Sequence, residues 1–80
     1  MISRFFRVPL DEIGYLRAIV DGYDGLAVVR AVQAGRGEVE WIIARGREEE
    51  AVALALRLAS ETGLCEIERP ADWPSISEKN

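Results

Sequence analysis

The sequence predicts a ferredoxin-like α+β fold, in which two helices cover one face of a four-stranded antiparallel sheet. Short segments rich in β-branched and aromatic residues indicate strands, and two longer segments with apolar residues at helical spacing indicate helices. These elements follow one another in the order βαββαβ. A split pair of βαβ units buries every apolar stripe in a two-layer sandwich, and right-handed crossovers then give the strand order 4-1-3-2.

Length and composition fit one small domain. The chain has 80 residues, of which 49% are apolar and 30% are charged, and this is an ordinary globular balance. We expect residues 1–70 to form the domain. Residues 71–80 are mostly polar, so we expect them to form a loose C-terminal tail.

Charge and residue types argue against several classes of function. The net charge of −4 disfavours binding to nucleic acid or to an anionic membrane surface. The chain has no histidine and one cysteine, so the usual residue for acid–base chemistry near neutral pH is missing and no intramolecular disulfide forms. No apolar run has the length of a membrane span or a signal peptide core. We therefore expect a cytoplasmic protein without a cofactor.

A strand and a helix are predicted in the first third of the chain. Residues 2–8 form the strand, which Pro9 ends, and Asp11 caps the helix that follows. Gly22 lies where this helix stops. One strand face holds Ile2, Phe6 and Val8, the other holds Ser3, Phe5 and Arg7, and the helix buries Ile13, Leu16, Val20 and Tyr23.

Residues 26–32 and 38–44 are predicted to pair as a hairpin whose loop contains Gly35 and Gly37. The register rests on side-chain fit, because a shift by one residue moves every side chain to the opposite face. Trp41 is then expected in the core. The predicted pairs are Val32–Glu38, Arg30–Glu40, Val28–Ile42 and Leu26–Ala44 on one face, and Ala31–Val39, Val29–Trp41 and Ala27–Ile43 on the other.

A second helix is predicted after Gly46, with three glutamates in its first turn, where carboxylates complement the helix dipole. Gly63 ends this helix, and residues 64–69 form the last strand. The predicted buried stripe is Val52, Ala55, Leu56 and Ala59, widened by Leu54 and Leu58. In the last strand, Cys65 and Ile67 are expected to face the core, and Glu66 and Glu68 the other side.

The candidate functional surface is the face of the sheet turned away from the helices, called here the outer sheet face. A contiguous apolar patch with a charged rim usually marks an interface. The predicted patch is Phe5, Leu26, Val28 and Ile42, with Arg7, Arg30, Glu40, Glu66 and Glu68 around it. Alternatively, the tail folds back and Trp73 covers the patch.

Three other features have ordinary structural interpretations. Glu48, Glu49 and Glu50 point about 100° apart on a helix, so they do not converge on a metal ion. Cys65 has no histidine to activate it as a nucleophile. The loop around Gly35 and Gly37 does not match a phosphate-binding motif and leads into a strand rather than a helix, so turn geometry accounts for its glycines.

Three segments carry a family resemblance: Val8-Pro9, the run Ile13-Gly14-Tyr15-Leu16 and the segment GYDGLAVV at residues 22–29. Through them the chain resembles a family of small bacterial domains of unknown function. The resemblance covers Phe5 to Ile67 and implies no known activity. The element order also looks like that of ACT domains, which bind amino acids at paired interfaces. Those domains typically carry an Asp-x-Pro-Gly segment after the first strand, whereas residues 8–12 read VPLDE, so no site residue is transferred.

These observations leave three functions open, and none is enzymatic, because no nucleophile–base pair can be assembled. We expect a non-catalytic module that forms a homodimer or binds a protein partner through the outer sheet face. An ACT-like domain that binds a small ligand is the first alternative. The second is an RNA-binding sheet, which needs several exposed aromatic residues and here has only Phe5.

Overall fold

The computed structural model describes residues 1–33 and 35–70 of the chain. The predicted tail, and the predicted cover of the sheet by Trp73, lie outside these residues. The elements in chain order are β1 (Ile2–Arg7), a short 3₁₀ turn (Leu10–Glu12), α1 (Ile13–Asp21), β2 (Ala27–Gln33), β3 (Glu38–Ile43), α2 (Glu48–Thr62) and β4 (Cys65–Ile67).

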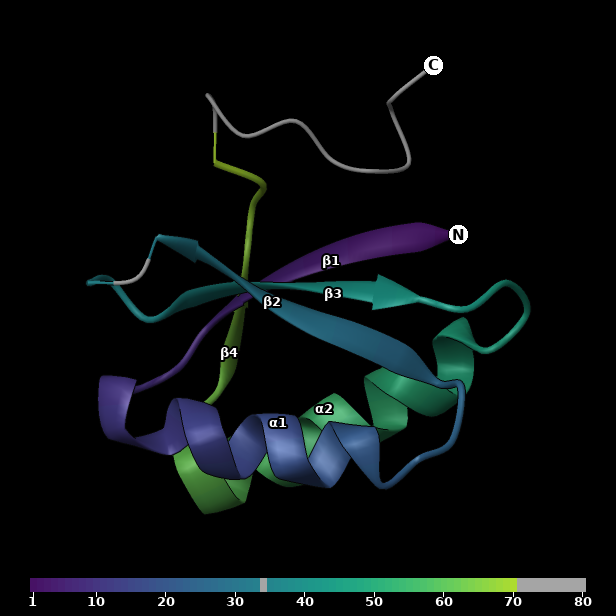
Figure 1. Ribbon diagram of the computed structural model, residues 1–80, viewed down its shortest axis with the longest axis horizontal. Helices are drawn as coiled ribbons and strands as arrows, with labels where there is room; N and C mark the ends of the chain where they lie inside the picture. Colours follow the sequence, from purple (N-terminus) through teal and green to yellow (C-terminus); the bar gives the residue numbers. More distant parts are fainter. Residues whose placement is uncertain (34, 71–80) are drawn as a thin grey trace.

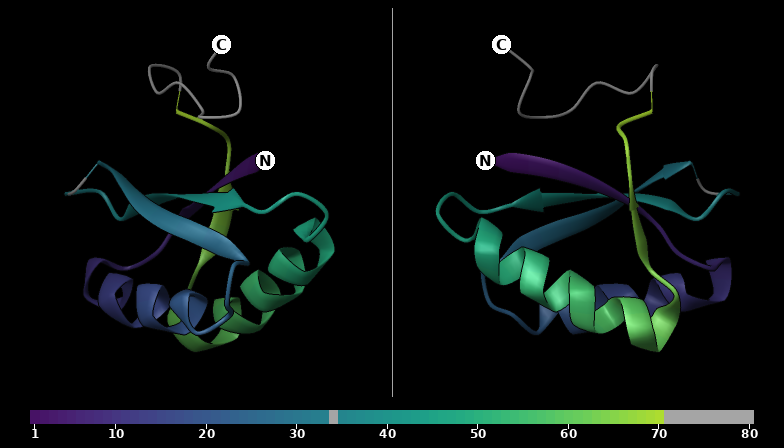
Figure 2. Two further views of the ribbon diagram at one scale, coloured as in Figure 1. Left: turned by 45° about the vertical axis from the view of Figure 1, so that its right-hand side comes forward. Right: turned by 180° about the vertical axis from the view of Figure 1, so that it is seen from behind.

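The four strands form one sheet in the order β2-β3-β1-β4, and every neighbouring pair is antiparallel. Both helices lie on the same side of this sheet, so the domain has two layers (Figure 1, Figure 2). The predicted α+β class and strand order 4-1-3-2 are confirmed, since that order read from the other edge is the one observed.

The helix ends follow local chemistry, with one correction. Gly63 adopts φ 82°, a left-handed conformation that suits glycine, and ends α2 as predicted. The predicted cap by Asp11 is wrong, because Asp11 lies inside the 3₁₀ turn and the N-terminus of α1 has no side-chain cap. The turn begins after Pro9, whose carbonyl accepts a hydrogen bond from the Glu12 amide at 2.9 Å.

The hairpin register is confirmed over five pairs, from Ala27–Ile43 to Ala31–Val39. The Leu26 carbonyl also accepts a hydrogen bond from the Ala44 amide at 2.9 Å. The predicted Val32–Glu38 pair is wrong: Glu38 lies opposite Gln33, because β2 contains one extra residue between Ala31 and Gln33. Such a bulge changes the alternation only locally, near the loop.

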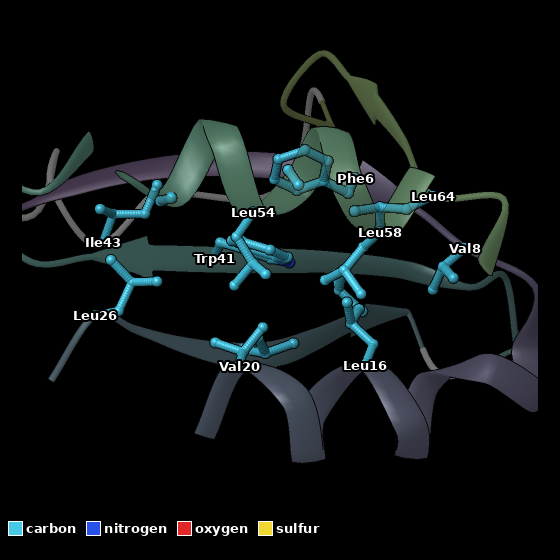
Figure 3. Packing of buried hydrophobic residues seen from close by; sticks show 14 residues of the cluster. Phe6, Val8, Leu16, Val20, Leu26, Trp41, Ile43, Leu54, Leu58 and Leu64 are labelled. Atoms are coloured by element: carbon cyan, nitrogen blue, oxygen red, sulfur yellow. The ribbon is translucent and has the colours of Figure 1, made fainter. Parts of the chain in front are cut away.

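The core fills the space between the sheet and the two helices (Figure 3). Trp41 lies on the central strand β3, is completely buried as predicted, and stands opposite Val29. The other buried cluster members are Phe6, Val8, Leu16, Val20, Leu26, Val39, Ile43, Ala51, Leu54, Ala55, Leu58 and Leu64.

Two placements predicted from alternation are wrong. Leu26 was expected on the outer sheet face, but it is fully buried in the core cluster, because it precedes β2 and belongs to the turn that follows α1. The faces of β4 are also inverted. Leu64 enters the core directly after Gly63, so Cys65 and Ile67 share a face with Arg7 and Phe5, and Glu66 lies on the helix side opposite Phe6.

Candidate interaction surface

The outer sheet face has an apolar end and a charged end, which follow from the alternation of β1, β2 and β3. At the apolar end, Val28 pairs with Ile42 across β2 and β3, and Ser3 pairs with Ile42 on the other side. Val28 is 57% exposed, whereas its cross-strand partner Ile42 is 6% exposed. Exposure at this end therefore comes from the edge strand.

A hollow of about 210 Å³ adjoins this apolar end. Met1, which is 66% exposed, contributes to it together with Val28 and Ile42. Its remaining walls come from the turn after α1 and the end of β3, with lining residues Asp21, Tyr23, Gly25, Leu26, Ala27 and Ala44.

Phe5 lies in the middle of the face, between Glu40 on β3 and Ile67 on β4. Its ring is only 4% exposed, so it does not present a free aromatic surface. Of the four apolar residues predicted to form the patch, Val28 is the accessible one, Phe5 and Ile42 are buried on the predicted face, and Leu26 lies in the core.

At the charged end, three of the predicted rim residues, Arg7, Arg30 and Glu40, form ion pairs within the chain. The Arg30 Nε donates to the Glu40 carboxylate at 3.1 Å, and Glu40 is fully buried. Arg7 donates to Glu38 at 3.1 Å, and Arg36 lies 3.5 Å from the same carboxylate. Each buried carboxylate therefore has a guanidinium beside it, as buried charges require.

Glu66 belongs to a different cluster, on the helix side of the sheet. Arg4 donates to Glu66 at 2.9 Å and to Glu48, at the start of α2, at 3.0 Å. These bonds raise the pKa of the Arg4 guanidinium. The bond to Glu66 has the larger effect, and the bond to Glu48 adds to it. The cluster ties α2 and β4 to β1.

Helix α2 exposes an apolar residue that helical spacing predicts to be buried. Leu56 was placed in the buried stripe of α2, but it is 71% exposed. Leu54, Ala55 and Leu58 are buried as predicted, whereas Val52 and Ala59 are only partly buried. The helix also buries Ala51 and Thr62. Helix α2 carries apolar residues around more than half of its circumference, so spacing alone did not single out the stripe that meets the sheet.

Two kinds of site are not found in the described ranges. Within residues 1–33 and 35–70, no three histidine, cysteine or acidic side chains are grouped so as to hold a metal ion. The helices of the same residues are too short and too polar to cross a membrane. The three glutamates at the start of α2 remain exposed or half-buried in its first turn, as expected for residues that complement the helix dipole.

The fold and this surface define a small two-layer α+β domain with an apolar area at one end of its outer sheet face. The chain belongs to the family described as Domain of unknown function (DUF4911), whose model matches residues 6–61. This confirms the resemblance to a family of small domains of unknown function. No curated protein matches the chain, and no solved structure does.

Proposed function

We propose that the chain is a non-catalytic interaction module that pairs with a second copy of itself through the outer sheet face. One observation carries the proposal: Val28 is an exposed apolar side chain on a sheet face that neither helix covers. With Met1, which is also exposed and lines the same hollow, it provides an apolar area that a two-fold axis can place against itself.

The charges of the face favour the same arrangement. Arg30 with Glu40, and Arg7 with Glu38, balance each other within one chain. Two such faces can approach without the strong repulsion that a single sign of charge would cause, and the outer guanidiniums can orient the pair. A standard interface takes about 800 Å² from each partner, so the contact would extend beyond Val28 and Met1 to the neighbouring charged residues.

The variant Val28→Lys tests the proposal. Light scattering over a concentration series should show a dimer for the wild-type chain and a monomer for Val28→Lys, because each lysine would place a charge in the apolar contact. Leu10→Lys is the matched control, since Leu10 is 54% exposed but lies in the 3₁₀ turn, and it should leave the dimer intact. A monomeric wild-type chain, or a dimeric Val28→Lys, contradicts the proposal.

We further propose a fold class and a cellular compartment for the domain. The order βαββαβ and the sheet order β2-β3-β1-β4 support assignment to the ferredoxin-like class. The single cysteine favours a reducing compartment, and the resemblance to bacterial domains suggests a bacterial cytoplasm.

One observation favours the ACT-like alternative, in which the domain binds a small ligand. A hollow of about 380 Å³ lies at the end of β1, beside Arg7 and Arg36. Both guanidiniums lie against Glu38, and the pair of cations exceeds that single carboxylate by one charge, which suits a small carboxylate with an apolar body beside Pro9 and Leu10. A panel of the common amino acids, screened by thermal shift against wild-type chain and Arg7→Ala, tests it: stabilisation of the wild type alone supports this alternative.

The RNA-binding alternative has less support, because Phe5, its one candidate for base stacking, is 4% exposed. We expect no binding of a fluorescent single-stranded oligoribonucleotide at physiological salt. Micromolar binding that Phe5→Ala abolishes would favour RNA over self-association.

A further inference from the structure

A second apolar surface lies on the opposite side of the sheet from Val28, where α2 meets the edge of the sheet. We call it the β4–α2 groove. It has a volume of about 280 Å³ and is lined mainly by apolar groups. Its lining residues are Phe6, Val52, Ala55, Leu56, Ala59, Leu64, Cys65 and Glu66.

The edge of the sheet beside this groove is open within the described residues. Strand β4 pairs with β1 on one side and is the last strand of the sheet on the other. Successive residues of a strand direct their N–H and C=O groups to opposite sides, so part of the backbone of Cys65–Ile67 points away from β1. Figure 2 shows β4 rising from the C-terminal end of α2, which places this edge next to the helix.

An open strand edge beside an apolar groove is the arrangement that binds an extended peptide by strand addition. A strand added to β4 would continue the sheet, and every second side chain of that strand would point to the helix side. Those side chains would enter the groove between Val52, Leu56 and Leu64. This occupant would cover Leu56, which is 71% exposed.

Charge decides which extended segment fits. Glu66 lies on the groove wall with its side chain 48% exposed, and Arg4 bonds it together with Glu48, so these three side chains keep a net negative charge. Glu68, which is also exposed, follows directly after β4. Glu49 is exposed one turn before Val52 on α2. A second copy joined antiparallel through β4 would bring the Glu66 and Glu68 carboxylates of both chains together, and like charges directly opposite are destabilising.

We propose that the β4–α2 groove binds an extended segment of a different protein, with apolar side chains at alternate positions and basic residues beside them. On the side of that strand that faces α2, the apolar side chains would fill the groove, and basic residues at neighbouring positions of the same side would meet Glu66 and Glu49. This site is separate from the self-association face of the proposed function.

A selection with a random displayed peptide library, using the full chain as bait, tests the inference. The enriched peptides should be basic, with apolar residues at every second position. In the nuclear magnetic resonance spectrum of the labelled chain, one such synthetic peptide should shift the amides of Cys65–Ile67 and the methyl groups of Leu56. Leu56→Lys should weaken its binding by about tenfold or more, because the lysine would both close the groove and repel a basic peptide.

Two controls separate this inference from the proposed function. Val28→Lys should lose the dimer and keep the peptide, whereas Leu56→Lys should lose the peptide and keep the dimer. Leu56 is a surface position on a helix, so a lysine there should leave the fold intact. The inference is wrong if no peptide is enriched, if the enriched peptides are acidic, if Leu56→Lys binds equally well, or if the shifts fall on the outer sheet face.

Discussion

The indole ring of Trp41 packs against the phenyl ring of Phe6, with ring centroids 4.8 Å apart and ring planes inclined by 45°. The two residues lie on neighbouring strands, and Phe6 stands opposite Val39, so this is a diagonal contact across the β1–β3 ladder. Tilted aromatic pairs at such distances stabilise a core beyond the area that they bury. The contact joins the two central strands beneath both helices.

Trp41→Ala should lower the free energy of unfolding by about 3–5 kcal/mol, as expected when a large buried side chain leaves a cavity. The indole Nε1 has no hydrogen-bond partner in the described part of the chain. Trp41→Phe therefore removes volume but no hydrogen bond, and should cost clearly less. Urea unfolding followed by circular dichroism measures both. A loss for Trp41→Ala as small as that of a surface substitution would contradict the assigned core.

Gly37→Ala should destabilise the chain more than Gly46→Ala. Both glycines have positive φ, 71° and 82°, which costs an alanine about 1–2 kcal/mol. At Gly46 the added methyl group meets open space, whereas at Gly37 it would collide with the carbonyl oxygen of Val8. The same backbone contact carries a hydrogen bond of 2.9 Å from the Val8 amide to the Gly37 carbonyl. If Gly37→Ala and Gly46→Ala lower the midpoint of thermal unfolding equally, the close contact between Gly37 and Val8 does not constrain the fold.

The sheet could be predicted from the sequence because its central hairpin carries strong alternation. Only one register places Arg30 opposite Glu40 while it puts Val29 beside Trp41, and the structure has this register. The bulge near Val32 could not be seen, because it depends on how the loop closes onto β1 through Gly37 and Val8.

The end of the chain was harder to predict, for physical reasons that Leu64 illustrates. A three-residue strand has too little alternation to define its faces. The left-handed turn at Gly63 directs Leu64, the residue before β4, into the core. Cys65 and Glu66 therefore lie on the opposite faces to those predicted. The exposure of Leu56 was missed for a related reason, since α2 has apolar residues on more than one side.

Arg4→Met should weaken the attachment of β4 to the rest of the sheet. Arg4 bonds both Glu66 and Glu48, so its loss leaves two carboxylates near each other without the cation between them. We expect a loss of up to about 1 kcal/mol in the free energy of unfolding, reduced at high salt, because the cluster is partly exposed. Hydrogen exchange at Cys65–Ile67 should accelerate. Arg45→Met, at an exposed position, is the control. If hydrogen exchange at Cys65–Ile67 accelerates equally in Arg45→Met, Arg4 does not hold β4 in place.

The pair Tyr15–Glu61 should make stability depend on alkaline pH. The Tyr15 hydroxyl donates to the Glu61 carboxylate at 3.0 Å across the two helices, and this bond raises the pKa of Tyr15 above its usual value of about 10. A pKa that is higher in the folded state stabilises the fold below the unfolded-state pKa, and the effect disappears as the pH rises through the folded-state pKa. Titration of the Tyr15 ring by nuclear magnetic resonance should show the raised pKa. Glu61→Gln should lower it, and an unchanged midpoint would contradict the assignment.

The thiol of Cys65 should react with an aromatic disulfide reagent in the native protein without prior unfolding, because Cys65 is exposed on β4. The matched control is Leu64→Cys combined with Cys65→Ser, which moves the thiol by one residue to a side chain that is 3% exposed. A buried thiol reacts only through opening of the structure, so the control should react orders of magnitude more slowly and should speed up in urea. Alternation requires this contrast if Gly63 directs Leu64 into the core. Equal rates for the two thiols, or a slower reaction at Cys65, would mean that the faces of β4 are the reverse of those described.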